Sequence, residues 1–94
     1  MDSAISLIGL MYKAGKLLLG DSALENMKKV KYLLIASDAS DKTKERFIKK
    51  CEYYQIEFNM SLTSEQLSKA LGKGNIKIIG ITDEGFVSSF KSKI

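Results

Sequence analysis

The sequence contains no histidine, no proline and no tryptophan, and its only cysteine is Cys51. Without histidine there is no imidazole for acid–base catalysis or metal binding, and with a single cysteine we expect no metal site. We also expect no cofactor. A lone cysteine forms no internal disulfide, which is typical of a reducing compartment. Cys51 falls on an apolar helical stripe, so we expect it in the core rather than at a catalytic site.

Long apolar runs are also missing. No stretch approaches the roughly 20 apolar residues of a membrane span. The N-terminus has neither the basic leader nor the cleavage site of a secretory signal. We therefore expect a cytoplasmic location and no membrane partner.

The composition that remains is that of one packed domain, spanning residues 1–94. Hydrophobic residues make up 45% of the chain. It contains 15 Lys and Arg and 11 Asp and Glu, which gives a net charge of +4. Arg46 is the only arginine. This balance favours an anionic partner, nucleic acid first, although a small protein can carry such charge for solubility alone. Tyr53, beside an inward Tyr54, is a candidate exposed aromatic.

Helical and strand patterns alternate along the chain. We expect helices over 5–12, 21–29, 42–54, 64–71 and 84–90. We expect strands over 17–19, 32–36, 56–60 and 76–81. Alternation at this spacing predicts an α/β fold, a single-domain three-layer α/β/α sandwich with four strands.

Several helix boundaries have clear signals. Ser3 is a fair cap for the first helix, and Gly15 supplies the left-handed residue that ends it. Thr63 and Gln66 form a capping box, Gly72 stops the helix that follows, and Asp83 caps the last one.

Two motifs could suggest an enzyme. Asp38 and Asp41 could act as a carboxylate pair in a small catalytic cleft, but both fall at a strand-to-helix junction, where aspartate commonly caps a helix. The glycine-rich stretch 72–74 lacks the full spacing of a phosphate-binding loop and follows a helix rather than a strand. Structural roles are favoured for both.

The corner at Gly20 is a better candidate for binding. A helix N-terminus offers unpaired N–H groups and partial positive charge, and glycine permits close approach of a ligand. Lys16 precedes the corner and Lys28 follows it. The alternative is that Ser22 and Glu25 form a capping box and the lysines are a solvated helix end; carboxylates in this turn would also repel phosphate.

Five segments, taken in order, are similar to a known family: 13–20, 31–38, 50–51, 67–73 and 81–86. The chain resembles the kink-turn RNA-binding ribosomal protein family, of the L-seven-Ae and L-thirty-e type. The resemblance is nearest to the L-thirty-e branch and to the bacterial YlxQ-type proteins, and it covers nearly the whole chain.

This resemblance implies a small mixed sheet, no catalysis, and binding to a sharply bent RNA helix, the kink-turn, in ribosomal or regulatory RNA. It implies a ribosomal or ribosome-associated ribonucleoprotein, with contacts from three neighbouring connections. The positions that it assigns to RNA binding, together with candidate lysines, are Lys16, Gly20, Asp21, Ser22, Lys28, Asp38, Gly72, Lys73, Gly74 and Asn75.

The chain departs from the family at the corner. Strong kink-turn binders carry Gly-x-Asn-Glu, whereas this chain has Gly20-Asp21-Ser22-Ala23, and Leu18 and Leu19 stand where basic residues are usual. We therefore expect RNA binding that is weaker or tuned to a different bent motif. The alternative is a protein–protein module of the same fold that has lost specific RNA recognition.

Overall fold

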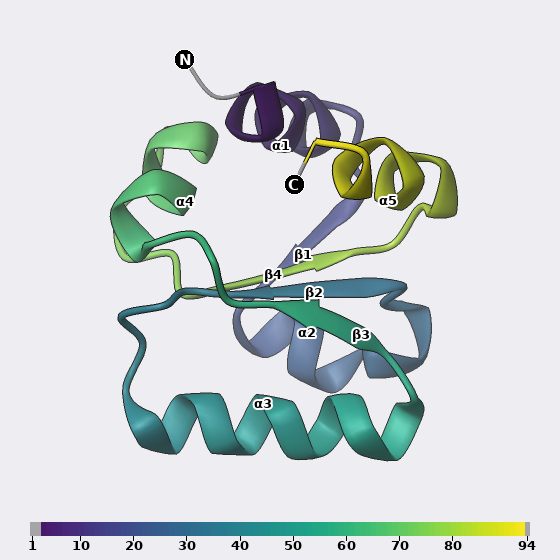
Figure 1. Cartoon of the computed structure of the whole chain (residues 1–94), viewed down its shortest axis with the longest axis vertical. Helices are drawn as coiled ribbons and strands as arrows, with labels where there is room; N and C mark the ends of the chain where they lie inside the picture. Colours follow the sequence, from purple (N-terminus) through teal and green to yellow (C-terminus); the bar gives the residue numbers. More distant parts are fainter. Residues whose placement is uncertain (1–2, 94) are drawn as a thin grey trace.

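A computed structural model describes residues 3–93 of the chain. Its four strands form one sheet in the order β1 (Leu17–Leu19), β4 (Ile78–Ile81), β2 (Tyr32–Ile35) and β3 (Glu57–Asn59) (Figure 1). β4 pairs antiparallel with both β1 and β2, whereas β2 and β3 are parallel. The sheet is therefore mixed, as the family resemblance implied.

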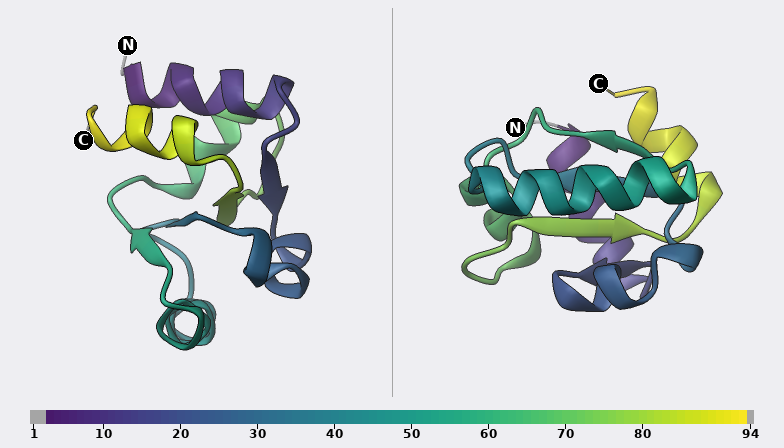
Figure 2. Two further views of the ribbon diagram at one scale, coloured as in Figure 1. Left: turned by 90° about the vertical axis from the view of Figure 1, so that its right-hand side faces the viewer. Right: turned by 90° about the horizontal axis from the view of Figure 1, so that it is seen from below.

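Helices cover both faces of the sheet. One layer contains α1 (Ser3–Lys13), α4 (Ser64–Leu71) and α5 (Glu84–Lys91) (Figure 1). The opposite layer contains α2 (Asp21–Glu25), the 3-10 helix η1 (Met27–Lys29) and α3 (Asp41–Tyr54), as the two turned views also show (Figure 2). The predicted three-layer sandwich is confirmed. None of the helices within residues 3–93 has the length and apolar character needed to cross a bilayer.

The core lies on both sides of the two central strands. Every residue of β2 and β4 is buried, which explains their continuous apolar sequences. The helices bury apolar stripes against them, including Ile8, Met11, Phe47, Leu67 and Phe90. Cys51 belongs to this core, and its burial raises the pKa of the thiol to about 11, so the prediction of a structural cysteine is confirmed.

The predicted helix boundaries are largely confirmed. Gly15 has a φ of 72° just after α1, and Gly72 ends α4 with a φ of 69°. Thr63 and Gln66 form the capping box of α4. The Phe86 N–H donates to the Asp83 carboxylate at 3.0 Å, which caps α5. Ser3, the proposed cap of the first helix, is instead its first described residue.

The helix predicted over 21–29 is divided at Asn26. The Asn26 side-chain amide donates to the Ser22 carbonyl at 2.8 Å, and this competition with the helical backbone accompanies a change from α2 to the 3-10 turn η1. The capping box predicted for Ser22 and Glu25 does not form within the described residues of α2. The N-cap is Gly20, which has no side chain, and Ser22 lies inside the helix.

The last strand is shorter than predicted. β4 begins at Ile78 rather than Ile76. The Ile76 N–H donates to the Ser68 hydroxyl at 3.0 Å, which ties this segment to α4 instead of to the sheet. Residues 73–77 therefore form a connection long enough to contribute to the surface beside β1.

Candidate nucleic-acid interface

The strand directions bring four connections to one edge of the sheet. β1, β2 and β3 end at the edge where β4 begins, because β4 is antiparallel to its two neighbours and β3 is parallel to β2. The Gly20 N–H donates to the Ile78 carbonyl at 3.2 Å, and the Ala36 N–H donates to the Lys77 carbonyl at 2.8 Å. We call this edge the rim; its connections are 20–22, 36–40, 60–63 and 72–77.

A surface hollow at the rim joins residues that are distant in the sequence. Gly20 and Asp21 form one side, the connection before β4 forms another, and α3 contributes Arg46. We call it the rim hollow, and its lining residues are Leu19, Gly20, Asp21, Thr43, Arg46, Phe47, Asn75, Ile76, Lys77 and Ile78. It is the place where the predicted corner and the predicted loop before the last strand meet.

Gly20 has the properties that a close backbone approach needs. Its φ of 52° and ψ of −123° lie in a region that L-residues rarely adopt. A Cβ atom at this position would meet nothing within 4 Å, so the surface above the backbone is open. The conformation explains why glycine stands here, and the open surface leaves room for a ligand.

The residues that follow Gly20 differ in exposure. Asp21 and Ser22 are exposed in the first turn of α2, whereas Ala23 is completely buried. Ala23 stands at the position of the family's signature glutamate, so the carboxylate is replaced by a methyl group within the core. At five residues α2 is also shorter than predicted, which leaves it a weak macrodipole.

Asp38 ties the connection 36–40 to the first residue of α4. Its carboxylate accepts hydrogen bonds from the Ser64 N–H and the Ser64 hydroxyl, each at 2.7 Å. These bonds hold the pKa of Asp38 below its usual value, with a smaller contribution from the charge of Lys77. Asp38 thus accepts from a helix N-terminal N–H, as expected of an aspartate at such a junction, but the helix is α4 rather than α3, which directly follows it.

The first turn of α3 is capped by another residue. The Ser40 hydroxyl accepts from the Thr43 N–H at 3.1 Å. Asp41 is the first residue of that helix, and the two carboxylates considered as a catalytic pair thus have separate structural positions. Both oxygens of Asp38 are already engaged with Ser64.

The connection before β4 contributes only in part to the rim hollow. Asn75 lines it and has a φ of 58°, whereas Gly72 forms the C-cap of α4. The Lys73 ammonium lies 5.3 Å from the centre of the Tyr12 ring, so its side chain extends toward the end of α1. Gly72, Lys73 and Gly74 belong to the same connection but lie outside the hollow.

Lys16 and Lys28 lie at the opposite edge of the sheet, which corrects their expected place beside Gly20. Lys16 precedes β1, and its carbonyl accepts from the Thr82 N–H at 3.0 Å. Lys28 borders a second hollow, the far-edge hollow, lined by Met27, Lys28, Val30, Lys31, Tyr54, Gln55, Ile56, Glu57, Glu84, Val87, Ser88 and Lys91. Neither lysine lines the rim hollow.

Sequence reasoning missed the basic residues that do line the rim hollow, Arg46 and Lys77. Arg46 precedes the buried Phe47 on α3, so its position at the border of the apolar stripe was a usable signal. Lys77 directly precedes β4 and therefore stands at a strand end. What the sequence alone did not show is that α3 and this strand end lie beside Gly20.

Known proteins similar to this chain were found by sequence and by structure. No family model matches. A protein named RNA-binding protein YlxQ from Enterococcus faecium is 34% identical, over 99% of this chain and 92% of its own length. A protein of the same name from Bacillus subtilis (strain 168) is 28% identical, over 92% of this chain and 89% of its own length.

Two solved structures share the fold. A protein of unknown function from Bacillus halodurans C superposes with a TM-score of 0.88 at 31% identity, covering 98% of this chain and 96% of that one. The Giardia lamblia 15.5kD RNA binding protein superposes with a TM-score of 0.77 at 18% identity, covering 96% of this chain and 82% of that one. Given the near-complete overlap with the Enterococcus relative, the chain belongs to the YlxQ family.

Proposed function

We propose that this protein is a non-catalytic RNA-binding protein whose rim recognises a bent, kink-turn-like duplex in ribosomal or regulatory RNA. The names of its curated relatives support RNA as the partner. The observation that carries the proposal is the rim hollow, which combines an open glycine backbone with Arg46 and Lys77.

The rim suits a bent RNA for a physical reason. A regular A-form duplex hides most base edges in a deep, narrow groove, whereas a sharp bend exposes them. The open backbone at Gly20 allows a base or sugar to approach closely, and the Asn75 amide can donate to and accept from a base edge. Arg46 and Lys77 supply cations for phosphates, and these contacts position the RNA rather than read its sequence.

The buried Ala23 limits which bend is recognised. No carboxylate is available at the position where strong kink-turn binders read sheared G·A pairs. In this protein Arg46, Asn75 and the Gly20 backbone replace that contact, so the favoured RNA is a bent motif that does not depend on the signature glutamate.

Fluorescence anisotropy tests the proposal with two RNAs of equal length, a kink-turn duplex and a straight duplex. We expect the bent RNA to bind at least about tenfold more tightly at the same salt concentration, since only it offers base edges to the rim. Equal, weak binding of both RNAs would overturn specific recognition and favour the protein–protein alternative. Co-sedimentation with ribosomal subunits tests the ribosomal assignment separately.

A further inference from the structure

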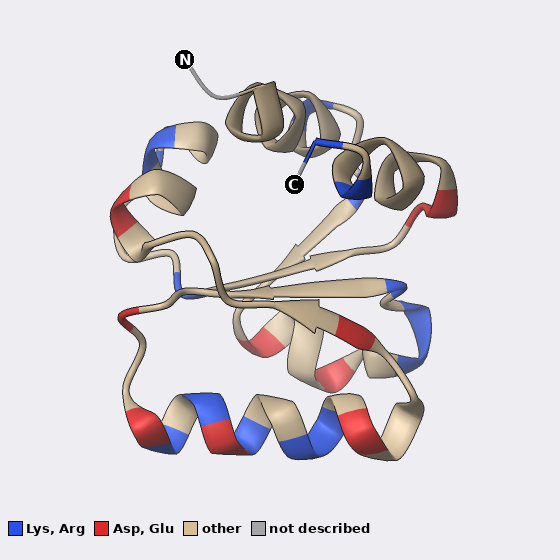
Figure 3. Cartoon of the chain, viewed as in Figure 1, with Lys and Arg blue, Asp and Glu red and all other residues tan. Residues whose placement is uncertain are grey.

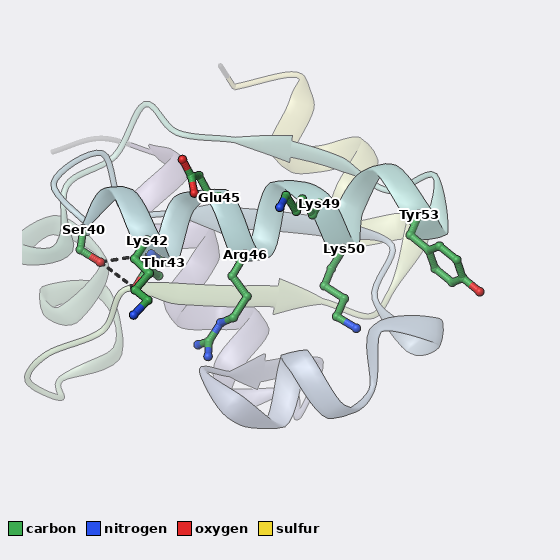
Figure 4. Close-up of a pocket in the computed structure, with 8 residues that line it drawn as sticks. All are labelled: Ser40, Lys42, Thr43, Glu45, Arg46, Lys49, Lys50 and Tyr53. Atoms are coloured by element: carbon green, nitrogen blue, oxygen red, sulfur yellow. Dashed lines mark hydrogen bonds between the residues drawn. The ribbon is translucent and has the colours of Figure 1, made fainter.

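The exposed surface of α3 separates its charges into two sides. At 100° per residue, Lys42, Arg46, Lys49, Lys50 and Tyr53 fall within a sector of about 100°. The helical projection puts three acidic residues, Asp41, Glu45 and Glu52, on the adjoining sector. Figure 4 shows Arg46, Lys50 and Tyr53 leaving α3 on one side and Glu45 on another. We call the five residues Lys42, Arg46, Lys49, Lys50 and Tyr53 the α3 stripe.

The α3 stripe is exposed and starts at the rim. Arg46 belongs both to the stripe and to the rim hollow, so the two surfaces are continuous. The stripe lines a third hollow, whose lining residues all come from Ser40 and α3 and include one carboxylate, Glu45. From Lys42 to Tyr53 the helix rises about 16 Å, the extent of a few nucleotides of a single strand.

The pattern is not explained by helix stability. Lys42 and Arg46, and then Arg46 and Lys50, are like charges at the i,i+4 spacing, which weakly destabilises a helix. Favourable pairs, Glu45 with Lys49 at i,i+4 and three more at i,i+3 (41/44, 42/45 and 49/52), roughly offset the like-charge pairs, so pairing along α3 gives no net reason for the stripe. Within residues 3–93 the one ion pair joins Lys91 to Glu57, so none involves a residue of α3.

Tyr53 adds a stacking surface at the far end of the stripe. Its side chain is 79% exposed. The Tyr54 ring holds it edge to face, with centroids 4.9 Å apart and an interplanar angle of 83°. An exposed, supported aromatic ring beside lysines is the combination that binds unpaired nucleotides by base stacking and phosphate contact.

We infer that the α3 stripe binds a single RNA strand that leaves the bent duplex at the rim, with Lys42, Arg46, Lys49 and Lys50 on its phosphates and Tyr53 stacked on an unpaired base. This inference rests on the proposed function, because the rim sets where the strand begins. The stripe is one or two residues wide, which fits one strand.

The test compares three RNAs: a bent duplex with blunt ends, the same duplex with an unpaired extension of about eight nucleotides, and the same duplex with a paired extension. The unpaired extension is placed at each strand end in turn. Binding of the blunt RNA reports on the proposed function alone. We expect the unpaired extension at one end to increase wild-type affinity about tenfold, and the paired extension to add little.

Two variants outside the rim hollow, Lys49→Gln/Lys50→Gln and Tyr53→Ala, isolate the stripe. Both should bind the blunt RNA like the wild type. The double variant should lose most of the gain from the extension. For the extended RNA, its plot of log affinity against log salt should be less steep than that of the wild type by about 1.4. Tyr53→Ala should bind the RNA with the unpaired extension about fivefold more weakly than the wild type does. The charge-matched control Lys13→Gln/Lys69→Gln, on α1 and α4, should keep the full gain.

Each other outcome is decisive. If the unpaired extension adds nothing, or if the stripe variants keep its gain, the inference is overturned while the proposed function stands. A gain from the paired extension that equals or exceeds the gain from the unpaired one would also overturn it. Failure of the wild type on the blunt RNA would overturn the proposed function itself, and the inference with it.

Discussion

The hollows at the two edges of the sheet have the same net charge, +1, but arrange their charged residues differently. The far-edge hollow has three lysines and two glutamates, and Lys91 forms an ion pair with Glu57 there. The rim hollow has Arg46 and Lys77 with one carboxylate, Asp21, and no ion pair recorded within residues 3–93 involves either cation. Charged positions along α3 and the far edge are visible in Figure 3.

This difference shows that net charge is a poor guide to the position of a polyanion site. At the far edge, lysine charge is largely offset by carboxylates of the same surface, which lowers its attraction for phosphate. At the rim, the cations adjoin the half-buried Gly20, where a Cβ would meet nothing within 4 Å, so charge and close approach coincide. Three predictions test this comparison, and a fourth tests a hydrogen bond within the rim.

The largest expected effect concerns the cations of the rim hollow. Arg46→Gln/Lys77→Gln should weaken binding of a blunt bent RNA about 100-fold, since each lost charged contact contributes about 1.5 kcal/mol or more. The charge-matched far-edge variant Lys28→Gln/Lys31→Gln should change affinity less than about threefold. Anisotropy titrations at one salt concentration measure both, and equal losses would remove the distinction between the edges.

The next effect concerns two glycines with positive φ, one at each edge. Gly20→Ala and Gly15→Ala should each lower the free energy of unfolding by about 1–2 kcal/mol, because both residues have a positive φ, which strains an L-residue, and neither position is crowded. Only Gly20→Ala should also weaken RNA binding by the folded protein. Urea unfolding and titrations well below the midpoint separate the two effects.

A smaller effect is expected at Asp21, the carboxylate of the rim hollow. Asp21→Asn should strengthen binding of the bent RNA about threefold, because it removes a repulsive charge beside the phosphates. The gain should shrink at high salt as screening increases. Glu84→Gln at the far edge is the control, and an equal gain there would indicate a nonspecific charge effect.

The smallest effect is the pH dependence contributed by Asp38. Its pKa is lower in the folded protein than in the unfolded chain, so its bonds to Ser64 stabilise the fold above the unfolded pKa, about 4. That stabilisation is lost as pH falls through the folded pKa. The urea midpoint of Asp38→Asn should be lower than that of the wild type at pH 6, and the difference should narrow toward pH 2.

Local sequence patterns were sufficient for the layers but not for the site. Apolar runs and caps such as Thr63 and Gly72 reflect short-range physics, so they were predictable. The site depends on β4 lying between β1 and β2, a long-range pairing that brings Asn75 and Lys77 to Gly20. Lys16 is close to Gly20 in the sequence but not in space, since the extended strand β1, about 10 Å long, lies between them.

The most direct test is a two-dimensional amide NMR titration of the labelled protein with the bent RNA. The account predicts that the largest shifts, or the earliest broadening, occur at Gly20, Asp21, Asn75 and Lys77, with little change at Lys16, Lys31 and Thr82. Shifts concentrated at the far edge, with the rim amides unmoved, would contradict it.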